Sequence, residues 1–276
     1  MNFFDVTIVI GIDGLGTLFD ENNMPNLSEL FKKSGELVKV NAMIPTDSAQ
    51  NWGSILHGVI PCYHQIKFEN LSKQYKNDEF PSIFKIISNQ YKNAKLGLFC
   101  SWDKIITGMV ESNIINMKTY SPIIDENIAS KIFMYLNHKL FNNPIYDKYL
   151  VPKVVNFIKN NIDIKFLFIH LDDIDEIGHI YKYKSNEYNS KLKKTDEYLS
   201  EIINTIKETW ENPLIIITTD HGGINNTHGK DSNDEVEVFI CSNHGLKKYN
   251  CENNKCVFKI ILDSLHINIP NYFYWK

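Results

Sequence analysis

Residues 214–230 place the strongest constraint on the fold of this 276-residue chain. Residues 214–217 are apolar and mostly β-branched, which is typical of a strand buried on both faces of a parallel sheet. The run stops at a polar corner that contains Asp220, His221 and two glycines, and His228 follows. The glycines let the chain turn there without a Cβ clash. A plain turn with surface histidines fits this segment as well as a metal-ligand corner does. Only partner residues elsewhere in the chain can distinguish the two interpretations.

Further strand-like and helix-like segments alternate along the chain. We expect strands at residues 6–12, 37–43, 95–100, 164–171, 214–217 and 236–241. We expect helices at residues 25–33, 48–58, 82–90, 127–140, 189–208 and 257–265. This alternation predicts an α/β fold, doubly wound, with a mostly parallel central sheet and helices on both faces. Residues 1–276 are expected to form a single catalytic domain, with a small lid-like insertion within residues 101–150, where prolines interrupt the pattern.

The overall composition excludes several classes of function. The formal net charge is -4, so no basic surface points to a nucleic acid polymer as partner. No apolar run approaches ~20 residues, so we expect no membrane partner through a spanning helix. The first nine residues carry no basic region or cleavage site, which argues against a signal peptide. The five cysteines are odd in number and scattered, which predicts reduced thiols in a cytoplasmic protein. Cys251 and Cys256 have no second Cys or His pair beside them, so a zinc knuckle is not expected there.

Metal-ligand side chains follow three of the predicted strands. In a parallel sheet the carboxyl ends of the strands share one edge, so these side chains can converge although they lie far apart in sequence. Three carboxylates and three imidazoles suit two divalent ions, zinc first and manganese as the alternative. Ser48 begins the helix after the second strand, where free backbone N–H groups attract a phosphate, although serines at such positions are usually only caps. The candidate ligands are Asp13, Asp175, His179, Asp220, His221 and His228.

Five motifs occur in an order that spans most of the chain. They are I-D-G at 12–14, P-T-D-S-A-Q-N at 45–51, H-G-x-x-P-x-x-H at 57–64, D-E-I-G-H at 175–179 and T-D-H-G-G-I-N-N-T-H-G at 219–229. With these motifs the chain resembles the alkaline phosphatase superfamily, and within it the nucleotide pyrophosphatase/phosphodiesterase-like branch. The resemblance implies an alkaline-phosphatase-like fold and a metal-dependent phosphoric ester hydrolase that acts on a small-molecule phosphoester.

The resemblance also implies a role for each matched residue. One metal ion would be held by Asp175, His179 and His228. The other would be held by Asp13, Asp220 and His221, with the oxygen of Ser48 completing its ligands. Ser48 matches the family's nucleophile, which implies a phosphoseryl intermediate. Asn51 matches a residue that donates a hydrogen bond to a phosphoryl oxygen.

Departures from the family pattern leave the substrate open. The branch usually has Thr at the nucleophile position and Pro just before the Asn, whereas this chain has Ser48 and Gln50. No C-x-P-x-R signature surrounds Ser48, which argues against a sulfatase. Lys104 and Trp102 are candidate substrate contacts, although Lys104 also fits a plain surface lysine.

Three functions therefore remain. The first is hydrolysis of phosphodiester or pyrophosphate bonds in nucleotide-like small molecules. The second is a phosphomonoesterase or phosphonate hydrolase with the same two metal ions. The third is a non-catalytic metal-binding relative, which the complete ligand set disfavours. No pattern in the sequence predicts the oligomeric state.

Overall fold

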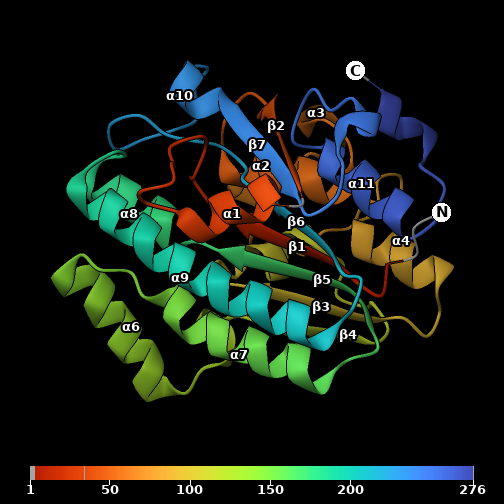
Figure 1. Cartoon of the computed structure of the whole chain (residues 1–276), viewed down its shortest axis with the longest axis horizontal. Helices are drawn as coiled ribbons and strands as arrows, with labels where there is room; N and C mark the ends of the chain where they lie inside the picture. Colours follow the sequence, from red (N-terminus) through yellow and green to blue (C-terminus); the bar gives the residue numbers. More distant parts are fainter. Residues whose placement is uncertain (1–3, 34, 276) are drawn as a thin grey trace.

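The fold is built on a seven-stranded sheet with the order β2-β7-β6-β1-β5-β3-β4 (Figure 1). The structure is a computed structural model that describes residues 4–33 and 35–275. The strands are β1 (Thr7–Ile12), β2 (Glu36–Asn41), β3 (Lys95–Cys100), β4 (Met117–Tyr120), β5 (Ile164–Leu171), β6 (Leu214–Thr218) and β7 (Glu237–Ser242). β7 runs antiparallel to both of its neighbours, β2 and β6, and the other neighbouring pairs are parallel. The predicted α/β class with a mostly parallel sheet is confirmed.

The central strands are buried on both faces because helices cover both sides of the sheet. Ile8 and Ile10 of β1 belong to one apolar cluster, and Val9 between them belongs to the other. The first cluster is shared with α1 (Pro25–Lys33), α7 (Tyr146–Asn160), α8 (Asp173–Tyr181) and α9 (Asn186–Thr209). The second is shared with α2 (Ser48–His57), α4 (Ile83–Gln90) and α11 (Cys256–Ser264). Among the described residues, no helix is both long and apolar enough to cross a membrane.

Residues 101–150, where a small lid-like insertion is predicted, also contribute to the central fold. They supply β4, which pairs with β3 at the edge of the sheet, and they begin α7, which packs on α9. Between them lie α5 (Pro122–Asp125) and α6 (Ile128–Phe141). Prolines do not end the helices here: Pro122 occupies the first position of α5, where its missing N–H costs nothing, and Pro152 lies inside α7.

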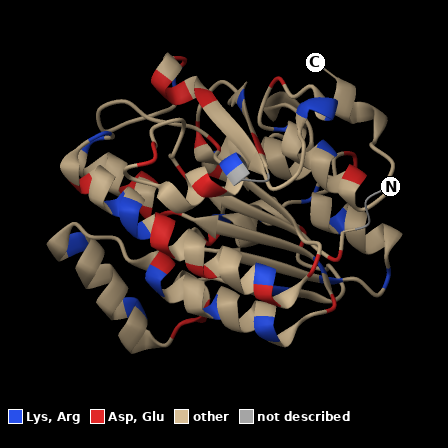
Figure 2. Cartoon of the chain, viewed as in Figure 1, with Lys and Arg blue, Asp and Glu red and all other residues tan. Residues whose placement is uncertain are grey.

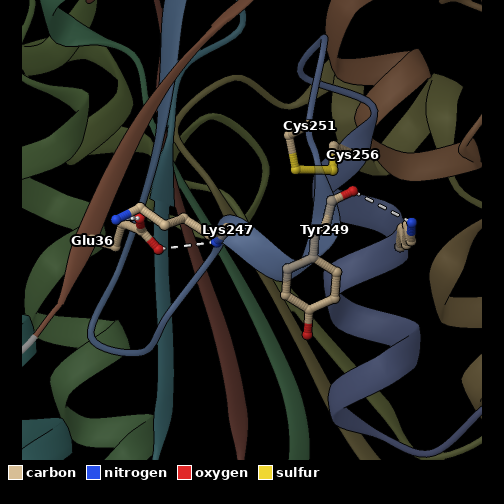
Figure 3. Close-up of a disulfide and its surroundings, with 6 residues drawn as sticks. Glu36, Lys247, Tyr249, Cys251 and Cys256 are labelled. Atoms are coloured by element: carbon tan, nitrogen blue, oxygen red, sulfur yellow. Dashed lines mark hydrogen bonds and ion pairs between the residues drawn. A yellow bond between two sulfur atoms is a disulfide. The ribbon is translucent and has the colours of Figure 1, made fainter.

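The prediction that all cysteines are reduced is wrong for one pair. Cys251 and Cys256 form a disulfide, with Cα atoms 5.6 Å apart, that joins the loop after Tyr249 to the first residue of α11 (Figure 3). The chain reverses within the short loop between them, which brings the two side chains within bonding reach. Cys62, Cys100 and Cys241 are free. The thiol argument for a cytoplasmic location therefore does not hold for this pair.

The remaining short α-helices of the described residues are α3 (Pro61–His64) and α10 (Asn233–Val236).

Candidate active site

The order of the strands explains why distant ligands converge. β6, β1 and β5 are neighbours and parallel, so the residues that follow them meet at one edge of the sheet. Asp13 follows β1 directly, and its backbone N–H donates to the Leu171 carbonyl at the end of β5 at 2.9 Å. Asp220 lies just beyond β6, and Asp175 lies in the first turn of α8, which follows β5. The sheet thus places three carboxylates side by side.

The first ligand group is Asp13, Asp220 and His221, all of them buried. His221 Nε2 lies 3.2 Å from Asp220 Oδ2 and 3.5 Å from Asp13 Oδ1. Ser48 adjoins this group, because its Oγ lies 2.9 Å from His221 Nε2 and 3.3 Å from Asp13 Oδ1. The serine hydroxyl therefore lies beside the first group.

The second ligand group is Asp175, His179 and His228. Asp175 and His179 are four residues apart on α8, so they share one face of the helix, and His179 Nε2 lies 3.1 Å from Asp175 Oδ2. His228 approaches from the loop after β6, with its Nε2 3.2 Å from His179 Nε2. The ring of His228 stacks on the ring of His221 at a centroid distance of 3.7 Å, so the two groups are adjacent.

Backbone carbonyls orient all three imidazoles in the same way. The Nδ1 atoms of His179, His221 and His228 lie 2.9, 2.9 and 2.7 Å from the carbonyl oxygens of Asn226, Gly222 and Thr46. An Nδ1–H that donates to a carbonyl leaves Nε2 as the atom that can bind a metal. The three Nε2 atoms face the carboxylates, which is the arrangement of donors that a pair of cations requires.

The electrostatics of the first group favour cations. Asp220 Oδ2 is buried without a hydrogen-bond partner. Burial, and then the charges of Asp13 and Asp175, raise the pKa of Asp220 well above its usual range. Burial lowers the pKa of His221 to about 4, so this imidazole is neutral at physiological pH. Buried carboxylates without enough compensating charge are costly, and divalent ions would remove that cost.

In the second group, His179 carries a proton beside Asp175, at a place that a metal cation could take instead. The hydrogen bond to Asp175 raises the pKa of His179 to about 9. Gly14 opens the space beside Asp175: its φ is +64°, and a Cβ at this position would overlap Asp175 Oδ1. Any side chain at residue 14 would therefore both strain the backbone and fill the site. The residues of both groups fit divalent ions.

Asp13 is held from behind by two donors. Trp52 Nε1 donates to Asp13 Oδ2 at 2.8 Å, and His170 Nε2 lies 2.9 Å from the same oxygen. Burial opposes ionisation of Asp13, but the bond from His170 and nearby imidazoles lower its pKa overall. The Tyr183 hydroxyl holds Asp175 Oδ1 in the same way. The apolar position of Trp52 within α2 gives no sign in the sequence that its indole N–H reaches Asp13.

Asn51 does not lie where its predicted role requires. Its side chain is fully buried, and its Nδ2 donates to the carbonyl oxygens of Met43, Pro45 and Asp47 at 3.1 to 3.2 Å. Its Oδ1 accepts from the Met43 N–H at 2.7 Å. The amide thus fixes the loop that precedes Ser48 and has no donor left for a phosphoryl oxygen. An Asn three residues into a helix can turn back on the preceding loop, and sequence alone does not reveal which way it points.

A pocket of about 360 Å³ opens over the two groups. Its lining combines residues of both groups with Asp47, Ala49, Phe68, Glu69, Trp102, Asp172 and Glu176. Trp102 lies in this lining, as predicted, whereas Lys104 pairs with Asp103 at 3.2 Å and does not line the pocket. Phe68 and Glu69 were not predicted, because they lie in a short 3₁₀ turn without a recognisable motif. Burial, and then the charge of Asp175, raise the pKa of Glu176 to about 7.

Residues 7–231 match the family described as type I phosphodiesterase / nucleotide pyrophosphatase. The chain belongs to this family. The assignment confirms the resemblance inferred from the sequence motifs, and it agrees with the expected enzyme class, a phosphoric ester hydrolase. The chain is 23% identical over 234 residues to the bis(5'-adenosyl)-triphosphatase ENPP4 of Homo sapiens, covering 78% of this chain and 47% of that protein. It is 31% identical over 96 residues to the GPI ethanolamine phosphate transferase 1 of Mus musculus, covering 33% of this chain and 10% of that protein. The chain therefore spans about half of the first relative's length and a tenth of the second's.

Solved structures share the fold at low sequence identity. Murine ectonucleotide pyrophosphatase / phosphodiesterase 5 superposes with a TM-score of 0.68 at 14% identity and covers 96% of each chain. The same protein has also been solved in complex with AMP. Phosphonoacetate hydrolase from Sinorhizobium meliloti 1021 superposes with a TM-score of 0.66 at 13% identity, covering 95% of this chain and 96% of that one. A 2-O GAG sulfatase reaches 0.71 at 10% identity, covering 98% and 72%.

Proposed function

We propose that the chain hydrolyses phosphodiester or pyrophosphate bonds of nucleotide-like small molecules, with Ser48 as the nucleophile and two divalent metal ions as cofactors. The observation that carries this proposal is the position of Ser48 Oγ within 3.3 Å of both Asp13 Oδ1 and His221 Nε2, next to a second complete ligand group. A serine used only as a helix cap has no reason to contact buried metal-ligand side chains.

Two ligand groups of mixed nitrogen and oxygen donors favour zinc, with manganese as the alternative. Asp175, His179 and His228 would hold one ion, and Asp13, Asp220 and His221 would hold the other together with Ser48. When bound, the ions would lower the pKa of the Ser48 hydroxyl and offset the negative charge of the phosphoryl group.

The side chains and backbone of the chain supply the remaining steps. Ser48 Oγ gives up its proton to water and forms a bond to phosphorus while the bond to the leaving-group oxygen breaks, and that oxygen takes a proton from water. A second water then adds to phosphorus, the Oγ–P bond breaks, and Ser48 regains its proton. Ser48 occupies the first turn of α2. The backbone N–H groups of a first turn have no acceptors within the helix, so they can donate hydrogen bonds to the phosphoryl oxygens. Asn51 contributes indirectly, by holding the loop that presents Ser48. Gly14 keeps the space beside Asp175 open.

The charge around the pocket favours a diester over a monoester. None of the described residues that line the pocket is a lysine, the four carboxylates of Asp47, Glu69, Asp172 and Glu176 lie there, and the chain contains no arginine at all. A phosphomonoester carries one more negative charge than a diester at neutral pH, and no side chain is available to balance it. Phe68 is 74% exposed at the pocket, and with Trp102 it offers aromatic surface to a nucleobase.

Metal analysis combined with a pair of matched substrates tests the proposal. We expect two divalent ions per chain, and faster hydrolysis of a bis-aryl phosphate than of the corresponding mono-aryl phosphate. Faster hydrolysis of the mono-aryl ester would support the phosphomonoesterase alternative instead. A chain with well under two ions that hydrolyses neither substrate would be a non-catalytic relative.

A further inference from the structure

The helix α6 exposes an apolar face to solvent. All of its 14 residues are described, and only Met134 is buried. Seven large apolar side chains on the helix are between 39% and 76% exposed. They are Ile128, Ile132, Phe133, Tyr135, Leu136, Leu140 and Phe141. A surface helix normally turns its apolar side chains toward the core, whereas α6 turns most of them toward solvent.

The exposed residues form a continuous strip. Ile128, Ile132, Leu136 and Leu140 are spaced four apart, so they follow one line along a helix about 21 Å long. Figure 1 shows α6 at the margin of the molecule, outside α7, with no other element over it. Its opposite side is anchored through His138, whose imidazole lies 3.0 Å from the Tyr146 hydroxyl and 3.2 Å from Glu176 Oε2.

The area of the strip is that of a dimer interface. Ile123 and Ile124 in the preceding α5 extend it and are 38% and 41% exposed. If a large apolar side chain contributes about 100 Å² at roughly half exposure, nine of them expose on the order of 1,000 Å². The largest apolar patch on a typical monomer is about 300–600 Å², whereas a stable interface buries about 800 Å² on each partner.

The charges near the strip complement those of a second copy. Asp125 and Glu126 lie just before α6, Lys131 and Lys139 lie on the helix, and residues 127–146 contain no acidic side chain. Glu126 pairs with Lys153 and Lys131 donates to the Ile124 carbonyl, which leaves Asp125 and Lys139 as the charges near the two ends. Figure 2 shows an acidic segment beside one end of α6 and basic positions along the helix itself. In an antiparallel pair, Lys139 of each helix approaches Asp125 of the other, and the two helix dipoles also oppose each other. An anionic lipid surface would attract Lys139 but repel Asp125, so a second copy of the chain matches the charges near the strip better than such a surface does.

We propose that α6 pairs antiparallel with α6 of a second copy of the chain, across a two-fold axis near Met134, to form a homodimer. Such an interface is isologous, so the same strip serves both copies. Ile128 of one copy then faces Leu140 of the other, and Ile132 faces Leu136. The dimer would also restrain α8, which carries Asp175 and His179, because Glu176 contacts His138. The proposal does not depend on the chemistry of the active site.

Light scattering during size-exclusion chromatography at micromolar concentrations tests the oligomeric state. We expect the mass of a dimer for the wild type and of a monomer for the double variant Ile132→Glu/Leu136→Glu. Both positions are exposed, so the circular dichroism spectrum of the variant should match that of the wild type, and its thermal unfolding should stay cooperative at a midpoint lowered only by the loss of association. A second variant, Lys139→Glu, should weaken the dimer, and adding Asp125→Lys should restore it.

Cysteine cross-linking tests the antiparallel arrangement. In a Cys62→Ser background, which removes the exposed free thiol, Ile128→Cys chains mixed with Leu140→Cys chains should form a disulfide-linked dimer under mild oxidation. Either protein alone should cross-link weakly, because equivalent positions lie about 18 Å apart along the helix axis.

A monomeric wild type would overturn the proposal, including the case in which it binds vesicles of phosphatidylcholine and phosphatidylserine through α6. A dimer that persists in the Ile132→Glu/Leu136→Glu variant would also overturn it, because the contact would then lie elsewhere.

Discussion

Replacing His170 measures how strongly Asp13 depends on the donors behind it. His170 is fully buried, and its Nε2 lies 2.9 Å from Asp13 Oδ2. A hydrogen bond to a charged group contributes about 1.5–3 kcal/mol, and about 1.4 kcal/mol is a tenfold change in affinity. We therefore expect His170→Met, which keeps most of the volume but has no N–H donor, to weaken binding of the ion at Asp13 by about 10–100-fold.

The assay is a zinc titration against a chelating dye, with His170→Gln as the matched control. Gln retains an N–H donor, so its affinity should remain within about threefold of the wild type. Urea unfolding of the metal-free proteins separates loss of binding from loss of the fold. If His170→Met binds two ions per chain with wild-type affinity, the hydrogen bond to Asp13 does not position the ligand and the reasoning is refuted.

Three further predictions concern stability and specificity. Burial lowers the pKa of His64 from 6.5 to about 3, so between these pH values the unfolded chain binds more protons than the folded chain, and stability falls as the pH falls. At pH 5 the free energy of unfolding is lower by about 2 kcal/mol for this reason. Urea unfolding of His64→Gln should therefore show a smaller loss of unfolding free energy between pH 7 and pH 5. Asn254 Nδ2 donates to Asn51 Oδ1 at 2.8 Å and to the Asp220 carbonyl at 3.1 Å; Asn254→Ala should lose about 1–3 kcal/mol of unfolding free energy, and an unchanged urea midpoint would contradict this. Glu69→Lys adds a positive charge to the pocket and should raise the ratio of mono-aryl to bis-aryl phosphate hydrolysis by about tenfold, whereas a lower ratio would speak against the charge argument.

The sequence predicts the central strands of this molecule and the grouping of the residues that directly follow them. Buried parallel strands are recognisable as β-branched runs, and the residues after them must share an edge, so the sequence alone groups Asp13, Asp175 and Asp220. In the fold the candidate ligands form two groups, with His228 adjacent to His179 rather than to Asp220. The resemblance to a family supplied that assignment, since spacing alone does not reveal which ion a distant histidine approaches.

Other features depend on side-chain direction and on contacts across long sequence distances. Asn51 has the right position for a phosphoryl contact, but its amide turns to the Met43–Asp47 loop and forms hydrogen bonds with backbone groups of Met43, Pro45 and Asp47 instead. The pairing of Cys251 with Cys256 depends on a local reversal that the composition does not encode. β4 has only four residues, too few for a periodic signal.

Trapping of the seryl intermediate tests the central claim most directly. The metal-loaded protein is mixed with a bis-aryl phosphate, quenched with acid and digested, and the peptides are analysed by mass spectrometry. We predict the mass of the bound aryl phosphate on Ser48, and neither this adduct nor hydrolysis above about a thousandth of the wild-type rate in Ser48→Ala. A Ser48→Ala protein that binds both ions and hydrolyses the substrate at the wild-type rate would contradict the account.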